Sequence, residues 1–347
     1  MKKVLLTILL MLSCFAMSAT LDEKISQMIM IGFDGDNVKS KDFKYVLKDI
    51  NSIGGVILFT KNIQDVKELN KMIKIIKDSS SVSPFVAIDN EGGQVLRFDF
   101  VDVKSSKEIS KMNYNLAKYE YTKLARANYE AGINLNLAPV VDLALNKDSI
   151  IVKKERSFGD DYRTVAKYAK LLIDEHSKYG IVTALKHFPG HGSAKGDTHL
   201  GFVDNTQVFE MSELMPYYLL KDTDKTTMVM ASHIFNSNID DKYPASLSSK
   251  TINDLLRGYI GFKGVVISDD YDMGAIRDNY SLEKIVTLAI NSGVDILLFS
   301  NNLKYYDIDI SKKIHKIIKR QIKRGKIKQE DIDKSYERIM ALKKNMH

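Results

Sequence analysis

The sequence lacks tryptophan and contains one cysteine and five prolines among its 347 residues. A lone cysteine, Cys14, cannot form a disulfide within the chain, and its place near the N-terminus leaves the rest of the chain without thiol chemistry. The scarcity of proline excludes a proline-rich linker. With 44% hydrophobic and 27% charged residues, the composition is typical of a globular protein and excludes a disordered, collagen-like or coiled-coil chain.

Apolar runs long enough to span a bilayer are also absent. A short apolar run at residues 4–11 follows two lysines and precedes a small-residue cleavage pattern, Ala16-Met17-Ser18. We therefore expect residues 1–18 to be a signal peptide and the mature protein to be soluble, exported and periplasmic. The alternative is a lipoprotein attached through Cys14. Leu12-Ser13-Cys14 only weakly resembles a lipobox, because a methionine precedes it where that motif prefers leucine.

Acidic residues are in the minority, with 44 Asp and Glu against 51 Lys and Arg and a formal net charge of +7. The basic excess lies in residues 303–347, which hold 14 basic and 6 acidic side chains in a helical pattern. Aromatic and basic residues do not alternate there as they do in surfaces that stack on bases. The pattern is typical of a solvated helix face, so we expect no nucleic-acid partner.

Short runs rich in valine, isoleucine and leucine alternate with amphipathic stretches from residue 25 onward. We expect eight strands, over residues 28–33, 55–60, 85–89, 133–137, 182–187, 228–233, 265–269 and 294–300. Helical periodicity lies between them, over residues 63–78, 115–131, 162–179, 282–292 and 308–324. Continuous apolar strands separated by helices predict a parallel sheet covered on both faces. Eight such units without a linker predict one α/β domain, a (β/α)8 TIM-type barrel over residues 19–347, with a doubly wound sheet as the structural alternative.

Five polar side chains lie at the ends of four of these apolar runs: Asp89, Lys186, His187, His233 and Asp269. Any one of them could be a helix cap or a loop residue. In a barrel, however, the carboxyl ends of all strands converge on one mouth, where the active site lies. We therefore expect these five side chains to share a site.

A histidine-rich stretch follows the fifth predicted strand. It contains Lys186-His187-Phe188-Pro189-Gly190-His191-Gly192 and then Asp197-Thr198-His199, so three of the seven histidines fall within 13 residues. The first two are four residues apart, as in a metal site, but the proline and glycine between them interrupt the helix that such spacing needs. General acid/base catalysis by His199, oriented by Asp197, is the second interpretation. A polar loop with structural histidines is the third.

Two further segments place carboxylates at strand ends. Asp269 in Ser268-Asp269-Asp270 faces the predicted mouth and suits a nucleophile, a base or a metal ligand, whereas the side chain of Asp270 should point elsewhere. Asp89 begins Asp89-Asn90-Glu91-Gly92-Gly93, which Arg97 follows, and Asp89 and Arg97 could hold hydroxyl groups. No phosphate-binding glycine loop is present, so the sequence does not support nucleotide chemistry.

Six segments carry a resemblance to a known family: Ile57-Leu58-Phe59-Thr60-Lys61-Asn62, Ile88-Asp89-Asn90-Glu91-Gly92-Gly93 with Arg97-Phe98, Asn136-Leu137-Ala138-Pro139-Val140-Val141-Asp142, Arg156-Ser157-Phe158-Gly159-Asp160, the stretch from Lys186 to His199, and Gly264 to Asp270. With these segments in order, residues 25–345 resemble glycoside hydrolase family 3. Within the family they are similar to the single-domain bacterial β-N-acetylglucosaminidases. The family's larger members have a second domain, which we do not expect here.

The resemblance implies a role for each matching residue. Asp269 corresponds to the nucleophile that forms a covalent glycosyl-enzyme, and His199 with Asp197 corresponds to the acid/base of the N-acetylglucosaminidase branch. The residues that correspond to those gripping the sugar are Asp89, Arg97, Arg156, Lys186 and His187. Most retaining glycosidases use two carboxylates, so a histidine acid departs from that plan. Histidine, with an ordinary pKa of about 6.5, can nevertheless give and take a proton near neutrality.

We therefore expect a retaining exo-glycosidase that removes non-reducing terminal β-linked N-acetylglucosamine from peptidoglycan fragments. Its partner is a carbohydrate substrate, it needs no metal or cofactor, and it acts as a monomer. The alternatives are a β-glucosidase or other exo-glycosidase of the family and a metal-dependent hydrolase with His187, His191 and Asp269 as ligands. A sugar-binding protein with an inactive site is the non-enzymatic alternative.

Overall fold

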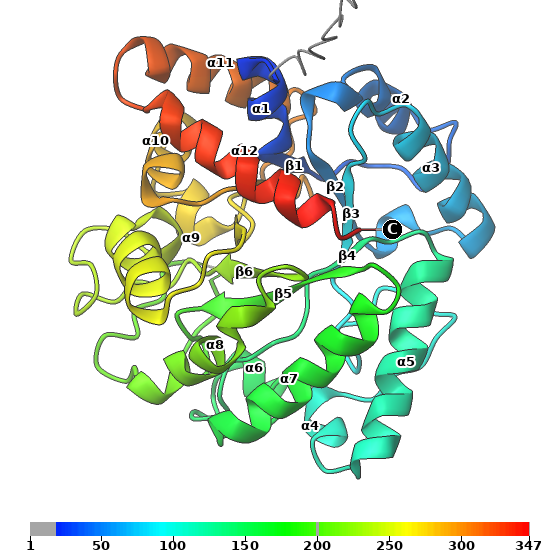
Figure 1. Ribbon diagram of the computed structural model, residues 1–347, viewed down its shortest axis with the longest axis vertical. Helices are drawn as coiled ribbons and strands as arrows, with labels where there is room; N and C mark the ends of the chain where they lie inside the picture. The colour runs from blue at the N-terminus through cyan, green and yellow to red at the C-terminus, as the bar shows by residue number, and fades with distance from the viewer. Residues whose placement is uncertain (1–18, 199–200, 347) are drawn as a thin grey trace, which may run out of the picture.

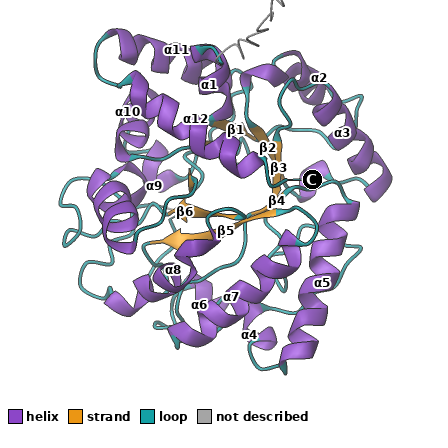
Figure 2. Cartoon of the chain, in the orientation of Figure 1, coloured by secondary structure: helices purple, strands orange, loops and turns teal. Residues whose placement is uncertain are grey.

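The computed structural model describes residues 19–198 and 201–346. The expected signal peptide with Cys14, and the predicted acid/base His199, lie outside the described residues. Eight parallel strands form the centre of the molecule, and helices surround them (Figures 1 and 2). The strands are β1 (Ile29–Ile31), β2 (Gly55–Leu58), β3 (Phe85–Ile88), β4 (Leu135–Asn136), β5 (Val182–Phe188), β6 (Thr227–Ala231), β7 (Val266–Ser268) and β8 (Leu297–Phe299).

The strand order identifies a barrel. Each strand from β1 to β6 pairs in parallel with the next strand along the chain, and β1 also pairs with β8. The ring closes through a parallel bridge between Ile267 in β7 and Ile296, just before β8. A doubly wound sheet would leave two edge strands and reverse its order at a switch point. The predicted (β/α)8 barrel is therefore confirmed.

Every residue of the eight strands is buried. Strands that are covered on both faces need apolar side chains at successive positions, which is why the sequence shows continuous rather than alternating apolar runs. The inward faces fill the barrel, and the outward faces pack under the helices.

The longer helices of the outer layer are α2 (Lys41–Lys48), α3 (Val66–Asp78), α5 (Tyr114–Glu130), α7 (Tyr162–Ser177), α10 (Leu282–Ser292), α11 (Ile310–Lys323) and α12 (Gln329–Lys343). Shorter helices are α1 (Leu21–Gln27), α4 (Ser106–Ile109), α6 (Ile150–Lys153), α8 (Met215–Leu220) and α9 (Gly274–Arg277). Polar side chains cap the N-termini of eight of these helices: Asp65 accepts from the backbone N–H of Glu68 at α3, for example. Gly293, at φ 94°, ends α10 in the left-handed conformation that glycine adopts without strain.

Residues 250–260 were not predicted as a helix, yet they form a π-helix, Lys250–Ile260, between β6 and β7. No helix within the described residues is long and apolar enough to cross a membrane.

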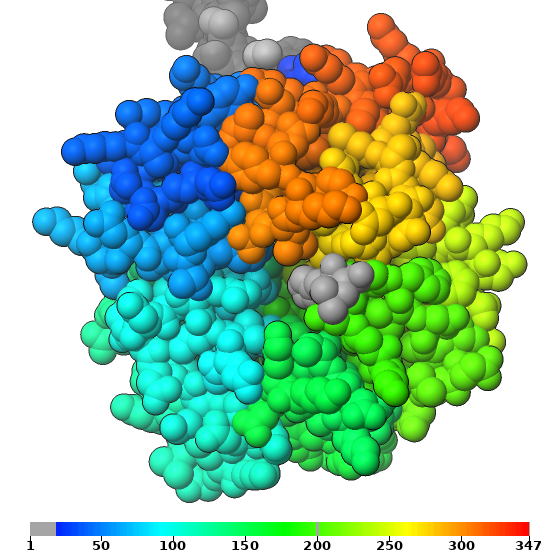
Figure 3. Space-filling model, turned by 180° about the vertical axis from the view of Figure 1, so that it is seen from behind, coloured from blue at the N-terminus to red at the C-terminus, as the bar shows by residue number. Residues whose placement is uncertain are grey.

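Helix α12 lies toward the N-terminal ends of β1 to β3. There, Lys343 donates to the backbone carbonyls of Gly54 and Ser83. Figure 3 shows the face opposite that of Figure 1, where segments from many parts of the chain converge.

Candidate active site

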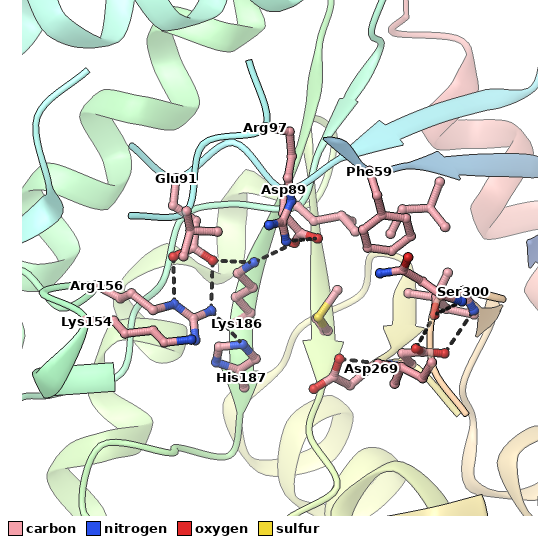
Figure 4. A pocket seen from close by; sticks show the side chains of 18 of the residues that line it. Phe59, Asp89, Glu91, Arg97, Lys154, Arg156, Lys186, His187, Asp269 and Ser300 are labelled. Atoms are coloured by element: carbon pink, nitrogen blue, oxygen red, sulfur yellow. Dashed lines mark hydrogen bonds and ion pairs between the residues drawn. The ribbon is translucent and has the colours of Figure 1, made fainter. Parts of the chain in front are cut away.

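Four of the five polar side chains predicted at strand ends meet at one cavity. Asp89 directly follows β3, and Asp269 directly follows β7. Lys186 and His187 lie near the carboxyl end of β5. All four line a cavity of about 330 Å³ at the carboxyl ends of the strands (Figure 4). The prediction that these side chains share the barrel mouth is confirmed.

His233 does not join them, so its predicted place in the site is wrong. The side chain is fully buried outside the cavity, with Nδ1 2.8 Å from the Ser246 hydroxyl and Nε2 2.8 Å from the backbone carbonyl of Asp270. Its ring stacks on Tyr271 at 5.5 Å between centroids. It supports the loop that follows β7, which is the structural role that any single strand-end residue can have.

A buried ionic cluster forms one wall of the cavity. The Lys186 ammonium lies 2.9 Å from Asp89 Oδ1 and 2.6 Å from Glu91 Oε1. Arg156 donates to both oxygens of Glu91, from Nε and Nη2, at 2.8 Å each. Arg97 lies at the edge, with Nη2 3.5 Å from Asp89 Oδ2. Such bidentate and charge-assisted bonds fix the side chains in one geometry.

The cluster keeps its groups charged. Burial by itself would raise the pKa of the Glu91 carboxyl, but Arg156 and Lys186 outweigh it and hold that pKa well below its usual value. Burial is likewise outweighed at Asp89, where Lys186 and Arg97 lower the pKa. Conversely, the two carboxylates raise the pKa of Lys186 against the effect of its own burial. The wall therefore presents fixed charges over a wide pH range.

Asp142, which follows β4, orients His187. Its Oδ2 lies 2.7 Å from His187 Nδ1, and its Oδ1 accepts from the backbone N–H groups of His187 at 3.2 Å and His191 at 2.8 Å. Because Nδ1 faces a carboxylate, the ring donates from Nδ1, and Nε2 is left to accept from Arg156 Nη2 at 3.4 Å. Asp142 thus sets the tautomer of a ring that borders the cavity.

Asp269 and Asp270 have different surroundings. Asp269 Oδ1 accepts from the Asp270 backbone N–H at 2.8 Å, and Asp269 borders the cavity. The Asp270 carboxylate turns toward the end of β8, where it accepts from the Ser300 backbone N–H at 2.9 Å and from the Ser300 hydroxyl. Burial raises the pKa of Asp270. The expected divergence of the two side chains is present, although Asp270 still touches the cavity.

Asp197 also reaches the site. A second, smaller cavity of about 40 Å³ is bordered by Asp197 and Thr198 together with Arg156, His187 and Asp269. The loop of the predicted acid/base pair therefore lies beside the predicted nucleophile. The pairing of Asp197 with His199 itself stays a prediction, because His199 lies outside the described residues.

The ligands expected for a metal-dependent hydrolase do not form a metal centre. Among residues 19–198 and 201–346, no three His, Cys, Asp or Glu side chains are grouped as metal ligands. His187 directs Nδ1 to Asp142. Burial lowers the pKa of His191, whose ring centroid lies 5.8 Å from that of His187. The donor set proposed for a metal is thus not assembled in the described part of the chain.

A (β/α)8 barrel with charged side chains at the strand ends, around one small polar cavity, defines an enzyme of the barrel class with a site for a polar small molecule. The chain belongs to glycosyl hydrolase family 3: the model of the family's N-terminal domain matches residues 20–342.

Sequence and structure comparisons agree on this family. The β-hexosaminidase of Tolumonas auensis is 33% identical over 266 residues, which cover 72% of this chain and 76% of that protein. The structure of a family 3 β-N-acetylglucosaminidase from Paenibacillus sp. matches 94% of this chain with a TM-score of 0.85 and 28% identity, although the chain spans only 63% of that protein. The β-N-acetylhexosaminidase of Beutenbergia cavernae matches with a TM-score of 0.82 and 25% identity, over 94% of this chain and 99% of that one. The predicted family is confirmed.

Three residues of the site had no predicted role. Glu91 and Asp142 both lie in segments that carried the resemblance, but nothing in their spacing indicated which side chain each would bind. Lys154, at the end of α6, lines both cavities and belongs to no motif that we recognised. The sequence feature that could have indicated Lys154 is its position two residues before Arg156, a residue with a predicted role.

Proposed function

We propose that this protein is a β-N-acetylhexosaminidase that removes terminal β-linked N-acetylglucosamine. The observation that carries the proposal is the meeting of Asp269, the Lys186 cluster and the Asp197 loop around one cavity. At about 330 Å³, this cavity is near the lower end of the usual range for small-molecule sites, about 300–1,000 Å³. A small polar pocket suits one terminal sugar better than the interior of a polymer. We choose N-acetylglucosamine as the sugar because relatives of this chain are named β-hexosaminidase.

In the proposed reaction, Asp269 attacks the anomeric carbon and forms a glycosyl-enzyme while the leaving oxygen takes a proton from His199. Water then attacks the anomeric carbon after His199 removes its proton, and Asp269 leaves. Asp197 orients His199 and supports its charged form. Both Asp197 and Asp269 border the smaller cavity, so a glycosidic bond held there would lie beside the nucleophile and beside the loop of the acid/base pair, which supports this mechanism.

Sugar hydroxyls would bind at the charged wall. Asp89 and Lys186 lie at its centre, and Arg97 adds a buried Nε that no described residue accepts from. His187 presents its ring to the same space. Arg156 donates two of its N–H groups to Glu91, so we assign it mainly to holding Glu91 and His187 in place.

The experiment compares aryl β-glycosides of N-acetylglucosamine, glucose and xylose. We expect the first to be hydrolysed with the highest kcat/KM. Asp269→Asn should lower its turnover by several orders of magnitude because the variant keeps the shape but loses the attacking charge. Asp254→Asn, at an exposed position of the π-helix, is the matched control and should retain full activity.

Other outcomes would favour the alternatives. Preference for glucose would identify a β-glucosidase, and loss of activity with a chelator would identify a metal-dependent hydrolase. A fluorinated substrate that traps the intermediate should label Asp269. Label on Asp270 or Glu91 would overturn the assignment of the nucleophile.

We also propose that the protein is exported, acts as a monomer and meets peptidoglycan fragments outside the cytoplasm. The signal-like sequence of residues 1–18 supports the export part of this proposal. Mass spectrometry should find a mature N-terminus at Ala19 or Thr20. A retained and lipidated Cys14 would contradict the soluble form.

A further inference from the structure

The two cavities share part of their lining, and the remaining lining residues differ between them. Lys154, Arg156, His187 and Asp269 border both. The larger cavity adds the sugar-gripping residues, whereas the smaller adds Asp197 and Thr198 from the acid/base loop together with Ile150 and Ile151 of α6. An acid must lie within hydrogen-bond reach of the oxygen it protonates. In the proposed reaction we therefore place the leaving group on the side of the smaller cavity, where Asp197 and Thr198 lie.

Lys154 is the cation on that side that lacks a carboxylate partner. The described part of the chain places no Asp or Glu oxygen within 4.0 Å of its ammonium, and its side chain is exposed. The other cations of the wall are neutralised locally, Lys186 by Asp89 and Glu91 and Arg156 by Glu91. Figure 4 shows Lys154 running beside Arg156 toward His187.

The helix end fixes the position of Lys154. It directly follows the last residue of α6, and its backbone N–H donates to the Ile150 carbonyl at 3.1 Å. The neighbouring Lys153 pairs with Asp148 at 3.7 Å and borders neither cavity. Two adjacent lysines thus have different surroundings: one is paired on the surface, and the other borders the reaction site.

We propose that Lys154 is a specificity residue that favours leaving groups with a carboxylate near the glycosidic oxygen. This inference rests on the proposed function, since it names the leaving group of that same reaction. The ammonium would pair with the carboxylate across the mouth, and the approach of the substrate would partly desolvate the pair. An exposed ion pair of this kind changes an equilibrium by about 5-fold or less, and salt weakens it. A sugar that carries a carboxylate belongs to this chemical class of leaving group.

The test uses two aryl β-N-acetylglucosaminides, with 3-carboxyphenyl and 3-carbamoylphenyl leaving groups. The measured quantity is the ratio of kcat/KM for the charged substrate to kcat/KM for the neutral one. We expect Lys154→Gln to lower this ratio by about 3- to 5-fold relative to the wild type. Because every ratio compares the same two phenols, their intrinsic difference in reactivity cancels when the ratio of a variant is divided by that of the wild type.

Three further measurements isolate the charge. Lys154→Arg should keep most of the wild-type ratio, because it keeps the cation. Lys153→Gln, the matched control one residue earlier, should leave both the ratio and the activity unchanged. High salt should lower the wild-type ratio toward that of Lys154→Gln while having little effect on the variant.

The outcomes separate this inference from the proposed function. If Lys154→Gln has the wild-type ratio while both substrates are hydrolysed, the inference is wrong and the proposed function stands. A lower ratio in Lys153→Gln as well would show a general effect of surface charge and would also overturn it. If the wild-type protein hydrolyses neither substrate, the proposed function and this inference fail together.

Discussion

At the scale of single residues, the site consists of charges that compensate one another. Glu91 accepts from Arg156 and pairs with Lys186, and Lys186 also pairs with Asp89. Removing one member of such a buried cluster leaves an uncompensated charge, which costs more than the pair contributes. These side chains therefore hold the wall in shape as well as forming the proposed sugar site.

The roles of His199 and His187 can be separated by the leaving group. Protonation of the leaving oxygen matters most for a poor leaving group, such as a second sugar, and least for an acidic phenol. We expect His199→Ala to lower kcat/KM far more for a disaccharide than for an activated aryl glycoside, and Asp197→Ala to show the same trend more weakly. His187→Ala should slow the hydrolysis of both substrates to a similar degree, because we assign this ring to binding and positioning the sugar, which is needed whatever the leaving group is.

The measurement is kcat/KM over a series of phenols of increasing acidity, with folding of each variant checked by circular dichroism. A His199 variant that loses the same factor with every phenol would contradict the acid/base role. A His187 variant with a steep dependence on the leaving group would contradict the positioning role.

Most of the site residues could be predicted from the sequence, but their contacts could not. Asp89, Lys186, His187 and Asp269 were visible because polar residues that end apolar runs stand out against the pattern. His233 showed the same pattern and was placed wrongly, since periodicity does not tell a mouth residue from one that turns into the next loop. The link from Asp142 to His187 depends on how two loops approach each other after β4 and β5, which no spacing encodes.

At the scale of elements, the loop after β5 depends on Glu213. Glu213 lies in a 3₁₀ turn before α8 and is buried. Its Oε2 accepts from the Gly192 N–H at 3.0 Å and the Ser193 N–H at 3.3 Å, and its Oε1 accepts from the Ser193 hydroxyl at 2.5 Å. One side chain thus ties down the backbone between the end of β5 and Asp197.

Glu213 makes stability depend on pH. Burial raises the pKa of Glu213 from 4.5 to about 7 in the folded protein. Between these values the folded protein holds a proton that the unfolded chain has released, so the free energy of unfolding falls as pH rises through this range. The fall is on the order of 3 kcal/mol. Glu213→Gln cannot ionise, keeps an acceptor for Gly192 and can donate to Ser193, so it should remove this fall.

Urea unfolding at pH 5 and pH 8 checks this prediction. The wild type should lose stability between the two pH values, and Glu213→Gln should lose markedly less. The exposed neighbour Glu210→Gln is the control and should behave as the wild type. Equal losses in the wild type and Glu213→Gln would show that the burial of Glu213 does not control the profile.

The strands and long helices were predicted near their observed places, and the differences have local causes. The fourth strand was expected over residues 133–137 but pairs only over Leu135–Asn136. The Asn134 side chain explains part of this, because its Oδ1 accepts from the Val86 N–H at 2.6 Å and takes the place of a backbone partner. The helix 282–292 was predicted with its observed bounds, since Ser281 and Gly293 mark both ends.

At the scale of the whole molecule, the barrel separates stability from chemistry. The site lies at the carboxyl ends of the strands, whereas Asp295 joins several elements at the opposite end. Its Oδ2 accepts from the Val266 N–H of β7 and from Arg257 of the π-helix, both at 2.8 Å. Its Oδ1 accepts from Ser335 at 2.8 Å and from Arg338 at 2.7 Å, both in α12. This carboxylate therefore supports the seam where β7 and β8 close the ring.

Asp295→Asn should destabilise the protein without changing its chemistry. The variant loses the charge that compensates two largely buried guanidinium groups, and breaking a buried ion pair typically costs about 3–5 kcal/mol. The site at the far end keeps all its contacts, so kcat/KM of the folded protein at low temperature should stay close to the wild-type value. Glu330→Gln, at an exposed position in the first turn of α12, is the control and should change the free energy of unfolding by about 0.5 kcal/mol or less. Urea unfolding measures the first quantity, and an aryl glycoside assay measures the second. A stable Asp295→Asn variant with reduced kcat/KM would reverse the assignment, because it would place the closing seam in the catalytic machinery instead of the support beneath it.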